Sequence, residues 1–195
     1  MGNRLNLPTA PGCQLHTLEL GVAHAPLLQA LFDANPAYFL AVQGEPAGPG
    51  EALEEIAGAL PQGISIGKKW VIGYADANGQ LVAMANLLAD IFVPGVWNLS
   101  TFMLATEHHG RGTAQTLYHA LERWVQAQGA QWLRLGVVQG YTRAERFWQR
   151  SGYHQTRLRH DYLIGSRLNT LRVLCKPLGG GKLDDYLALV PRDRP

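Results

Sequence analysis

Two glycines between an apolar strand and an amphipathic helix constrain this chain more than any other feature of its sequence. The segment His109-Gly110-Arg111-Gly112-Thr113-Ala114 follows an apolar stretch over residues 97–104. Apolar residues then recur at intervals of three and four up to Val125, which predicts the buried face of a helix. Glycine permits left-handed backbone angles, and amides at a helix start attract anions. The segment therefore predicts either a plain strand-to-helix turn or a phosphate-binding turn, in which Arg111 would add a charged contact.

The elements expected on either side of this turn predict a mixed α/β fold. A strand over residues 14–20, two helices between residues 26 and 60, and three strands between residues 70 and 104 come first. A helix, a strand, a helix and two strands follow. Short connections make the front half antiparallel, and residues 97–138 form one strand-helix-strand crossover. We expect an α/β (α+β) domain with a central mixed, mostly antiparallel sheet flanked by helices.

Composition narrows the class of partner. The 195 residues are 47% hydrophobic and only 16% charged, and the formal net charge is +2. A charge this small gives no overall attraction to nucleic acid or to an anionic membrane. We therefore expect neither as a partner.

The cysteines, the apolar runs and the glycine run near the C-terminus indicate the kind of chain and its division into parts. Cys13 and Cys175 are far apart and belong to no paired motif, so neither a disulfide scaffold nor a metal site is expected. The sequence shows no signal peptide and no apolar run long enough to span a membrane, which favours a cytoplasmic protein. Three glycines at 179–181 divide the chain into a domain over residues 1–178 and a C-terminal surface tail over 179–195.

Two other glycine motifs do not fit the turn. A Walker loop requires Gly-Lys followed by Ser or Thr, and no such triplet occurs in the chain. A dinucleotide fingerprint requires Gly or Ala three residues after Gly112, where Gln115 stands.

The turn instead resembles the acyl-CoA signature of the GNAT N-acetyltransferase superfamily. The family pattern is Gln or Arg, two residues, Gly, one residue, then Gly or Ala; here His109 occupies the first position. Residues 144–153 are similar to a second family run, an Ala, an aromatic pair and a closing Gly-aromatic. The expected order of elements agrees with that fold over residues 14–177, and the resemblance implies a sheet that splays at the acyl-CoA site.

The resemblance implies acetyl-CoA as cosubstrate and N-acetyl transfer as the reaction. The acceptor would be a small-molecule or peptide amine, and the family makes a homodimer plausible. Met103 and Leu104 would offer backbone groups to the pantetheine, and Arg143 or Arg146 would contact the 3′-phosphate. The signature itself, from His109 through Gly110, Arg111, Gly112 and Thr113 to Ala114, would hold the pyrophosphate.

The catalytic residues are less clearly marked. The family often places a Tyr general acid where this chain has Trp148, and the strand before the turn carries no carboxylate. We expect Asp90 to accept the amine proton through a water held by Asn98 or Ser100. Neither cysteine lies on the elements that would hold a thioester, so direct transfer is expected. The alternative is a non-catalytic acyl-CoA sensor or interaction domain.

Overall fold

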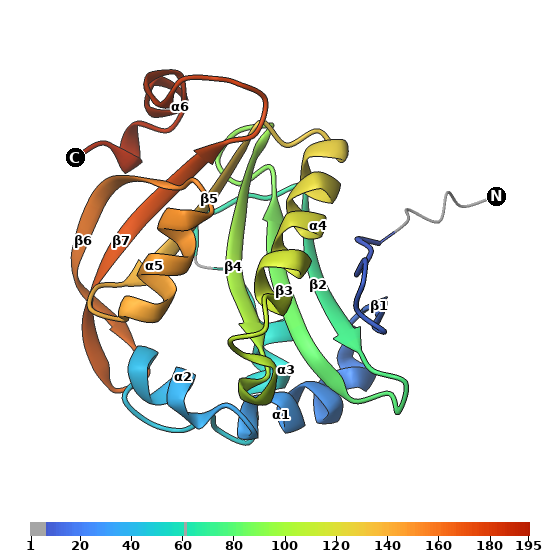
Figure 1. Ribbon diagram of the computed structural model, residues 1–195. Helices are drawn as coiled ribbons and strands as arrows, with labels where there is room; N and C mark the ends of the chain where they lie inside the picture. Colours follow the sequence, from blue (N-terminus) through green and yellow to red (C-terminus); the bar gives the residue numbers. More distant parts are fainter. Residues whose placement is uncertain (1–6, 61) are drawn as a thin grey trace.

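One seven-stranded sheet organises the computed structural model, which describes residues 7–60 and 62–195 (Figure 1). In spatial order the strands are β1 (His16–Glu19), β2 (Lys68–Ala75), β3 (Leu81–Ala89), β4 (Val96–Leu104), β5 (Trp132–Val138), β7 (Arg167–Pro177) and β6 (His154–Ile164). All neighbouring strands are antiparallel except β4 and β5, which are parallel. The expected mixed, mostly antiparallel sheet with one central crossover is confirmed.

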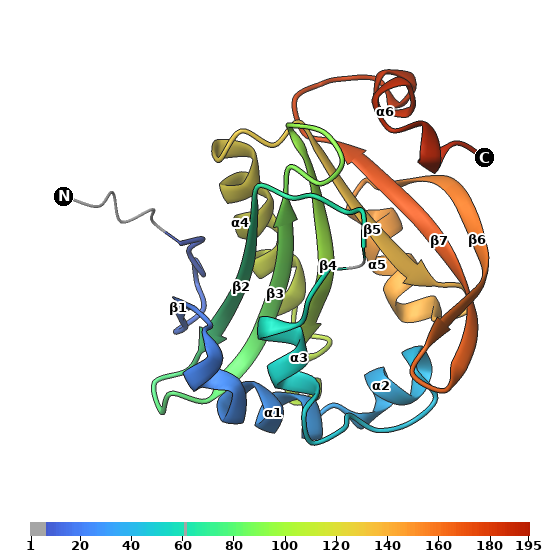
Figure 2. The same ribbon diagram turned by 180° about the vertical axis from the view of Figure 1, so that it is seen from behind.

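Helices cover both faces of the sheet. The α-helices are α1 (Ala25–Asp33), α2 (Pro36–Val42), α3 (Glu51–Ala57), α4 (Thr113–Ala127), α5 (Thr142–Arg150) and α6 (Leu183–Leu189). Helices α4 and α5 lie on the face turned to the viewer in Figure 1, whereas α1, α2 and α3 lie on the opposite face (Figure 2). Side chains alternate between faces along a strand. On β5, Leu133 and Leu135 therefore join the core beneath α4, and Arg134 points to the other face.

The parallel pair β4 and β5 separates soon after it forms. Pairing joins only Val96–Asn98 to Trp132–Arg134. On the other side of β4, Asn86 pairs with Thr101 and Leu87 with Leu99, so Ser100 is an extra residue. Such a bulge bends its strand and increases the local twist. The two strands part immediately beyond this point, which opens the sheet between them.

Two local expectations differ from the structure. Proline commonly stops a helix, but Asn35-Pro36 instead begins the additional helix α2, because Pro is well suited to a first helical position. Asn35 ends α1 by donating its side-chain amide to the Leu31 carbonyl at 2.7 Å. The sequence Thr142-Arg143-Ala144-Glu145 has the spacing of a capping box, but Thr142 lies inside α5 and makes no cap. Glu145 binds Arg172 instead, with Nε and Oε1 2.6 Å apart.

The segment expected as a surface tail is packed into the fold. Residues 183–189 form α6 and Pro191–Asp193 form a 3₁₀ turn, both above the end of β7 in Figure 1. The side chains of Tyr186, Val190 and Asp193 are at most 1% exposed. Apolar burial and an ion pair to the sheet hold the segment in place, and the division of the chain at 178/179 stays a prediction.

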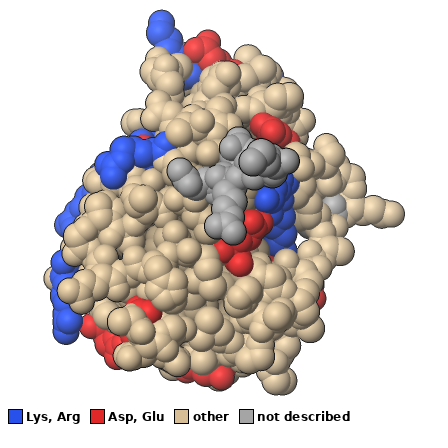
Figure 3. Space-filling view, turned by 90° about the vertical axis from the view of Figure 1, so that its right-hand side faces the viewer, with Lys and Arg blue, Asp and Glu red and all other residues tan. Residues whose placement is uncertain are grey.

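The surface agrees with the low charge content. The face in Figure 3 shows scattered charged side chains among large uncharged areas, with several Lys and Arg along one margin. No helix within the two described ranges is long and apolar enough to cross a membrane.

Candidate functional site

A cleft of about 940 Å³ opens where β4 and β5 part. On one face of the sheet it runs between the start of α4 and helix α5. On the other face it is bounded by α2 and by the β6–β7 hairpin. The cleft therefore passes through the sheet and has two arms, one on each face.

The glycine turn forms the end of the first arm. Gly110 and Gly112 have φ angles of +78° and +79°, and Gly112 is the residue that precedes the first turn of α4. A Cβ atom added to either glycine would meet nothing within 4 Å. The left-handed backbone requires glycine, and the open space above it lets a ligand approach the amides. The cradle therefore fits a phosphate group.

The sequence-predicted CoA residues occupy this arm only in part. Met103, Leu104, His109, Gly110, Gly112, Ala114 and Arg143 all line the cleft. Arg111 and Thr113 are in the same turn but do not line it. Met103 and Leu104 lie beyond the last residue of β4 that pairs with β5, so β5 leaves this edge of β4 open.

His109, which departs from the family pattern, turns its ring back onto β4. Its Nε2 lies 2.8 Å from the Leu104 carbonyl oxygen, so Nε2–H donates and Nδ1 keeps a lone pair. That Nδ1 atom is buried and has no partner among the described residues. Burial lowers the pKa of His109, and the charge of Arg143 lowers it further. The hydrogen bond to the Leu104 carbonyl raises the pKa but does not outweigh them. His109 is therefore neutral and fixes the end of β4.

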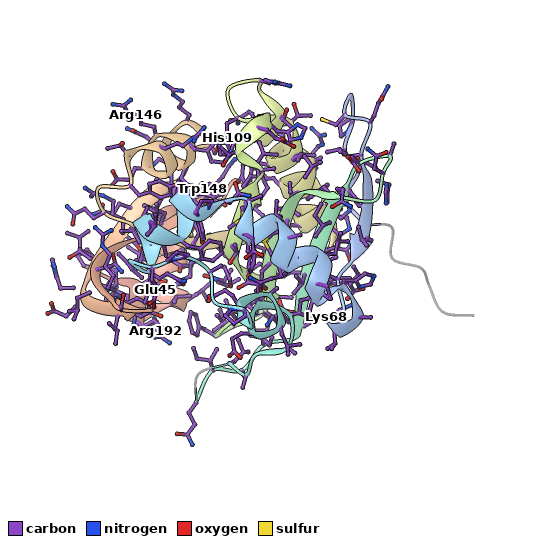
Figure 4. All side chains as sticks on the ribbon, turned by 90° about the horizontal axis from the view of Figure 1, so that it is seen from below. Glu45, Lys68, His109, Arg146, Trp148 and Arg192 are labelled. Carbon is purple, nitrogen blue, oxygen red and sulfur yellow. The ribbon has the colours of Figure 1, made fainter. Side chains whose placement is uncertain are left out.

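Three arginines of α5 line the same arm. Arg143, Arg146 and Arg150 recur at helical spacing, and none forms an ion pair within the described residues. Figure 4 labels His109, before α4, and Arg146, on α5, which contribute from different elements. This arm therefore combines backbone donors with free positive charge.

Trp148 is a packing residue in the structure. Its side chain is 7% exposed and its ring makes edge contacts with Phe102, Tyr118, Phe147 and Tyr153. An indole offers only an N–H donor of very high pKa and is no substitute for a phenol in acid catalysis. The aromatic cluster instead anchors α5 beside the opening of the sheet.

The structure brings two of the three proposed catalytic residues together. Asn98 and Ser100 line the cleft, and Asn98 Nδ2 donates to Ser100 Oγ at 2.9 Å. Asp90 lies in the β3–β4 turn, at the opposite end of β4 from the glycine turn. Its Oδ1 accepts the Gly95 amide at 2.7 Å, and Asp90 does not line the cleft.

A carboxylate that sequence reasoning missed lies closer to Ser100. Glu55 on α3 lines a hollow of about 140 Å³ that also includes Ser100 and Asn86. Asn86 Nδ2 donates to Glu55 Oε1 at 2.9 Å. Burial raises the pKa of Tyr38, and the charge of Glu55 raises it further. No sequence signal separates Glu55 from other acidic residues on a solvated helix face.

The second arm contains a buried ion pair. Arg134 Nε lies 2.6 Å from Asp193 Oδ2, and its Nη1 donates to Asn98 Oδ1 at 2.8 Å. Burial alone would raise the pKa of Asp193, but the hydrogen bonds and charge of Arg134 outweigh burial and lower it. Tyr186 also donates to Asp193. The C-terminal segment therefore compensates a charge that lies at the closed end of the opening.

The two cysteines lie outside this site. Burial raises the pKa of the Cys175 thiol to about 12, so almost no thiolate forms near neutral pH. Cys13 packs at the edge of the core beneath α4 and does not line the cleft. Within the described residues, no group of three His, Cys, Asp or Glu could hold a metal ion.

Comparison with known proteins agrees with this geometry. Residues 65–153 match the acetyltransferase (GNAT) family, a region that includes β2 to α5 and the glycine turn. A search of curated proteins found no match.

Several solved structures share the fold. An acetyltransferase from Thermus thermophilus aligns with a TM-score of 0.64 at 20% identity, over 85% of this chain and 97% of that one. The spermidine N-acetyltransferase of Vibrio cholerae, solved with CoA and spermine, aligns with a TM-score of 0.64 at 16% identity, over 85% and 96%. The ribosomal-protein-S18-alanine N-acetyltransferase of Escherichia coli gives 0.63 at 12% identity, over 86% and 96%.

Proposed function

Because residues 65–153 match the acetyltransferase (GNAT) family, we propose that this protein transfers an acetyl group from acetyl-CoA to an amine. The observation that carries the proposal is the early separation of β4 and β5 beside a glycine cradle. An open strand edge and a set of free amides are the two features that an extended pantetheine with a pyrophosphate requires.

The donor residues follow from their places in the first arm. The amides of Gly110, Arg111, Gly112, Thr113 and Ala114 would hold the pyrophosphate. The open edge at Met103 and Leu104 would pair with the pantetheine, and His109 would fix that edge through the Leu104 carbonyl. Arg143, with Arg146, would contact the 3′-phosphate as an exposed cation. Acetyl-CoA, when bound, supplies the activated acetyl group.

We propose direct transfer without an acyl-enzyme. The amine nitrogen attacks the thioester carbonyl carbon, and the carbon–sulfur bond breaks. The nitrogen loses a proton, and the departing thiolate takes up a proton to become the CoA thiol. The raised pKa of Cys175 and the position of Cys13 outside the cleft support this route. A double Cys13→Ala, Cys175→Ala variant that stays folded should keep its turnover, and a trapped acyl-cysteine would contradict the route.

The proton acceptor that we propose is reached through Ser100. Ser100 is shared between the cleft and the hollow of Glu55, and Asn98 orients its hydroxyl. Asp90, which the sequence suggested, lies in the β3–β4 turn, outside the cleft. Its carboxylate accepts a hydrogen bond from the Gly95 amide. Glu55 therefore replaces Asp90 in the proposed proton path.

The acceptor class that we propose is a small-molecule or peptide amine. Both kinds occur among the structural neighbours, one named for spermidine and one for an alanine of a ribosomal protein. We also propose that the protein forms a homodimer, as the family resemblance implies.

Two measurements test the function. Calorimetry with acetyl-CoA and with CoA should show binding, and CoA release should appear with at least one member of a panel of amino acids, peptides, polyamines and simple amines. Binding without turnover across the panel would favour the acyl-CoA sensor, which the family match does not favour. Failure to bind acetyl-CoA would contradict both.

A further inference from the structure

The second arm of the cleft is lined by different elements from the first arm and includes Arg159. We call it the β6 chamber and define it by Val42 of α2, Gly136 of β5, Leu171 and Val173 of β7, and Arg159 and Tyr162 of β6. Its lining includes Val42 of α2, and α2 lies on the face of the sheet opposite α4 and α5 (Figure 2). A ligand in the chamber would approach the opening between β4 and β5 from the side not used by the donor.

The chamber has one uncompensated charge. No Asp or Glu of residues 7–60 and 62–195 lines the cleft. Arg134, at the inner end, is paired with Asp193. Arg159 is half-buried, and its guanidinium forms neither an ion pair nor a hydrogen bond within the described residues. Its contact is with the Tyr162 ring, 4.6 Å from the guanidinium carbon.

A strained bulge aims Arg159 and Tyr162 at the same face. Arg159 pairs with Leu171 and Tyr162 with Asn169, so three steps along β6 match two along β7. Regular pleating would send residues three apart to opposite faces. The inserted turn is at Asp161, which has a φ of +53°, a conformation that non-glycine residues rarely adopt. Backbone strain of this kind and bulges that redirect side chains both concentrate at binding sites.

These observations define a recognition element. The Tyr162 ring lies against the guanidinium, 4.6 Å from its central carbon, while the five N–H donors stay available. A planar fork of donors matches a carboxylate, which can accept two hydrogen bonds at once. One free cation balances a single negative charge, whereas a phosphate dianion would call for more.

We propose that the acceptor is an amine that also carries a carboxylate, and that Arg159 binds this carboxylate. The inference rests on the proposed function, since it assigns the second substrate of the same site. Neighbouring strands are about 4.8 Å apart, so β6 lies roughly 10 Å from β5 and the acceptor would span the β6 chamber between them. A polyamine would instead place its cations beside Arg159 without any lining carboxylate to offset them.

The test uses matched amine pairs with and without the carboxylate. Glycine, β-alanine, 4-aminobutyrate, 6-aminohexanoate and dialanine are compared with alkylamines of equal length and with spermidine. Calorimetry on the CoA-loaded protein measures binding, and CoA release measures turnover. We expect at least one carboxylate-bearing member to bind at least tenfold tighter than its alkylamine partner.

Three variants assign that preference to Arg159. Arg159→Gln should remove the tenfold ratio and leave acetyl-CoA affinity unchanged, and Arg159→Lys should keep part of it, because the charge remains without the fork. Arg123→Gln, an exposed arginine on α4 outside the cleft, should behave as wild type.

The outcomes separate the two proposals. No carboxylate preference in binding, or a preference that survives Arg159→Gln, overturns the inference, whatever the turnover. Arg159-dependent binding without CoA release from any acceptor supports the inference and contradicts the transferase function.

Discussion

The two arms of the cleft are built from different parts of the polypeptide. In the proposed donor arm, one continuous segment, residues 103–114, supplies the backbone amides and the open strand edge, and α5 adds arginine side chains. The β6 chamber uses side chains from α2, β5, β7 and β6, and the C-terminal segment compensates Arg134. Backbone groups do not depend on the identity of the side chains. The proposed donor arm can therefore bind the same ligand, acetyl-CoA, even when nearby side chains are substituted. Side chains line the chamber, so on the proposed function we expect substitutions there to change the choice of acceptor and to leave donor binding unchanged.

The largest effect should come from breaking the Arg134–Asp193 pair. Asp193→Asn keeps the shape of the side chain but leaves Arg134 as a buried charge without a counter-ion. Removing one partner of a buried pair typically costs about 3–5 kcal/mol in the free energy of unfolding. Denaturant unfolding measures this loss. Asp185→Asn in the same segment is the control, since its carboxylate only accepts the Lys182 amide at an exposed position. Equal losses in the two variants would contradict the role of the pair.

The same pair should make stability depend on pH. The pKa of Asp193 is lower in the folded protein than the value of about 4 for a free side chain. Its contribution is therefore complete above pH ~4 and is lost as pH falls through the folded-state pKa. Unfolding experiments between pH 7 and pH 3 should show the difference between wild type and Asp193→Asn shrinking at the acidic end. A difference that grows with acid would contradict this linkage.

The donor arm should respond most strongly to a side chain at Gly112. Gly112→Val places methyl groups in the space above the amides and forces a left-handed φ, so acetyl-CoA affinity should fall by at least tenfold, about 1.4 kcal/mol. Gly79→Val is a matched control, because Gly79 has the same φ of +79° and the same open surroundings, in the β2–β3 turn. Both variants should lose similar stability, but only Gly112→Val should lose affinity by calorimetry.

A smaller effect is expected at Arg143. Its exposed side chain should contribute a screened contact to the 3′-phosphate, so Arg143→Gln should weaken acetyl-CoA binding by about fivefold, roughly 1 kcal/mol. The loss should diminish as salt is added and should be absent with dephospho-CoA. An equal loss for dephospho-CoA would place Arg143 elsewhere on the donor.

The smallest effect is expected at Asp90. Asp90→Asn should leave the turnover of the acceptor found in the panel within twofold, because the side chain lies outside the cleft. Glu55→Gln should lower kcat well beyond that. A large loss of kcat in a folded Asp90→Asn variant would restore Asp90 as the proton acceptor.

The donor arm could be predicted because its information is local. Gly110 and Gly112 stand two residues apart at a strand-helix junction, and the periodicity after them identifies the helix. The other arm depends on pairs such as Asn98–Arg134, which are 36 residues apart, and Arg134–Asp193, which are 59 apart. No spacing rule indicates such contacts. The sequence predicted that Asp90 lies near the opening of the sheet. In the structure it lies in the β3–β4 turn, at the end of β4 away from the glycine turn, and it does not line the cleft.

The Arg134–Asp193 pair also has a consequence for synthesis of the chain. The two residues are 59 positions apart, and β5 lies in the middle of the sheet. At about 5–20 residues per second, a ribosome takes roughly 3–12 s to travel from one to the other. During that interval β5 can pair with β4, but burial of Arg134 would leave a guanidinium without its counter-ion. We therefore expect the centre of the sheet to stay hydrated around Arg134 until Asp193 becomes available to pair with it.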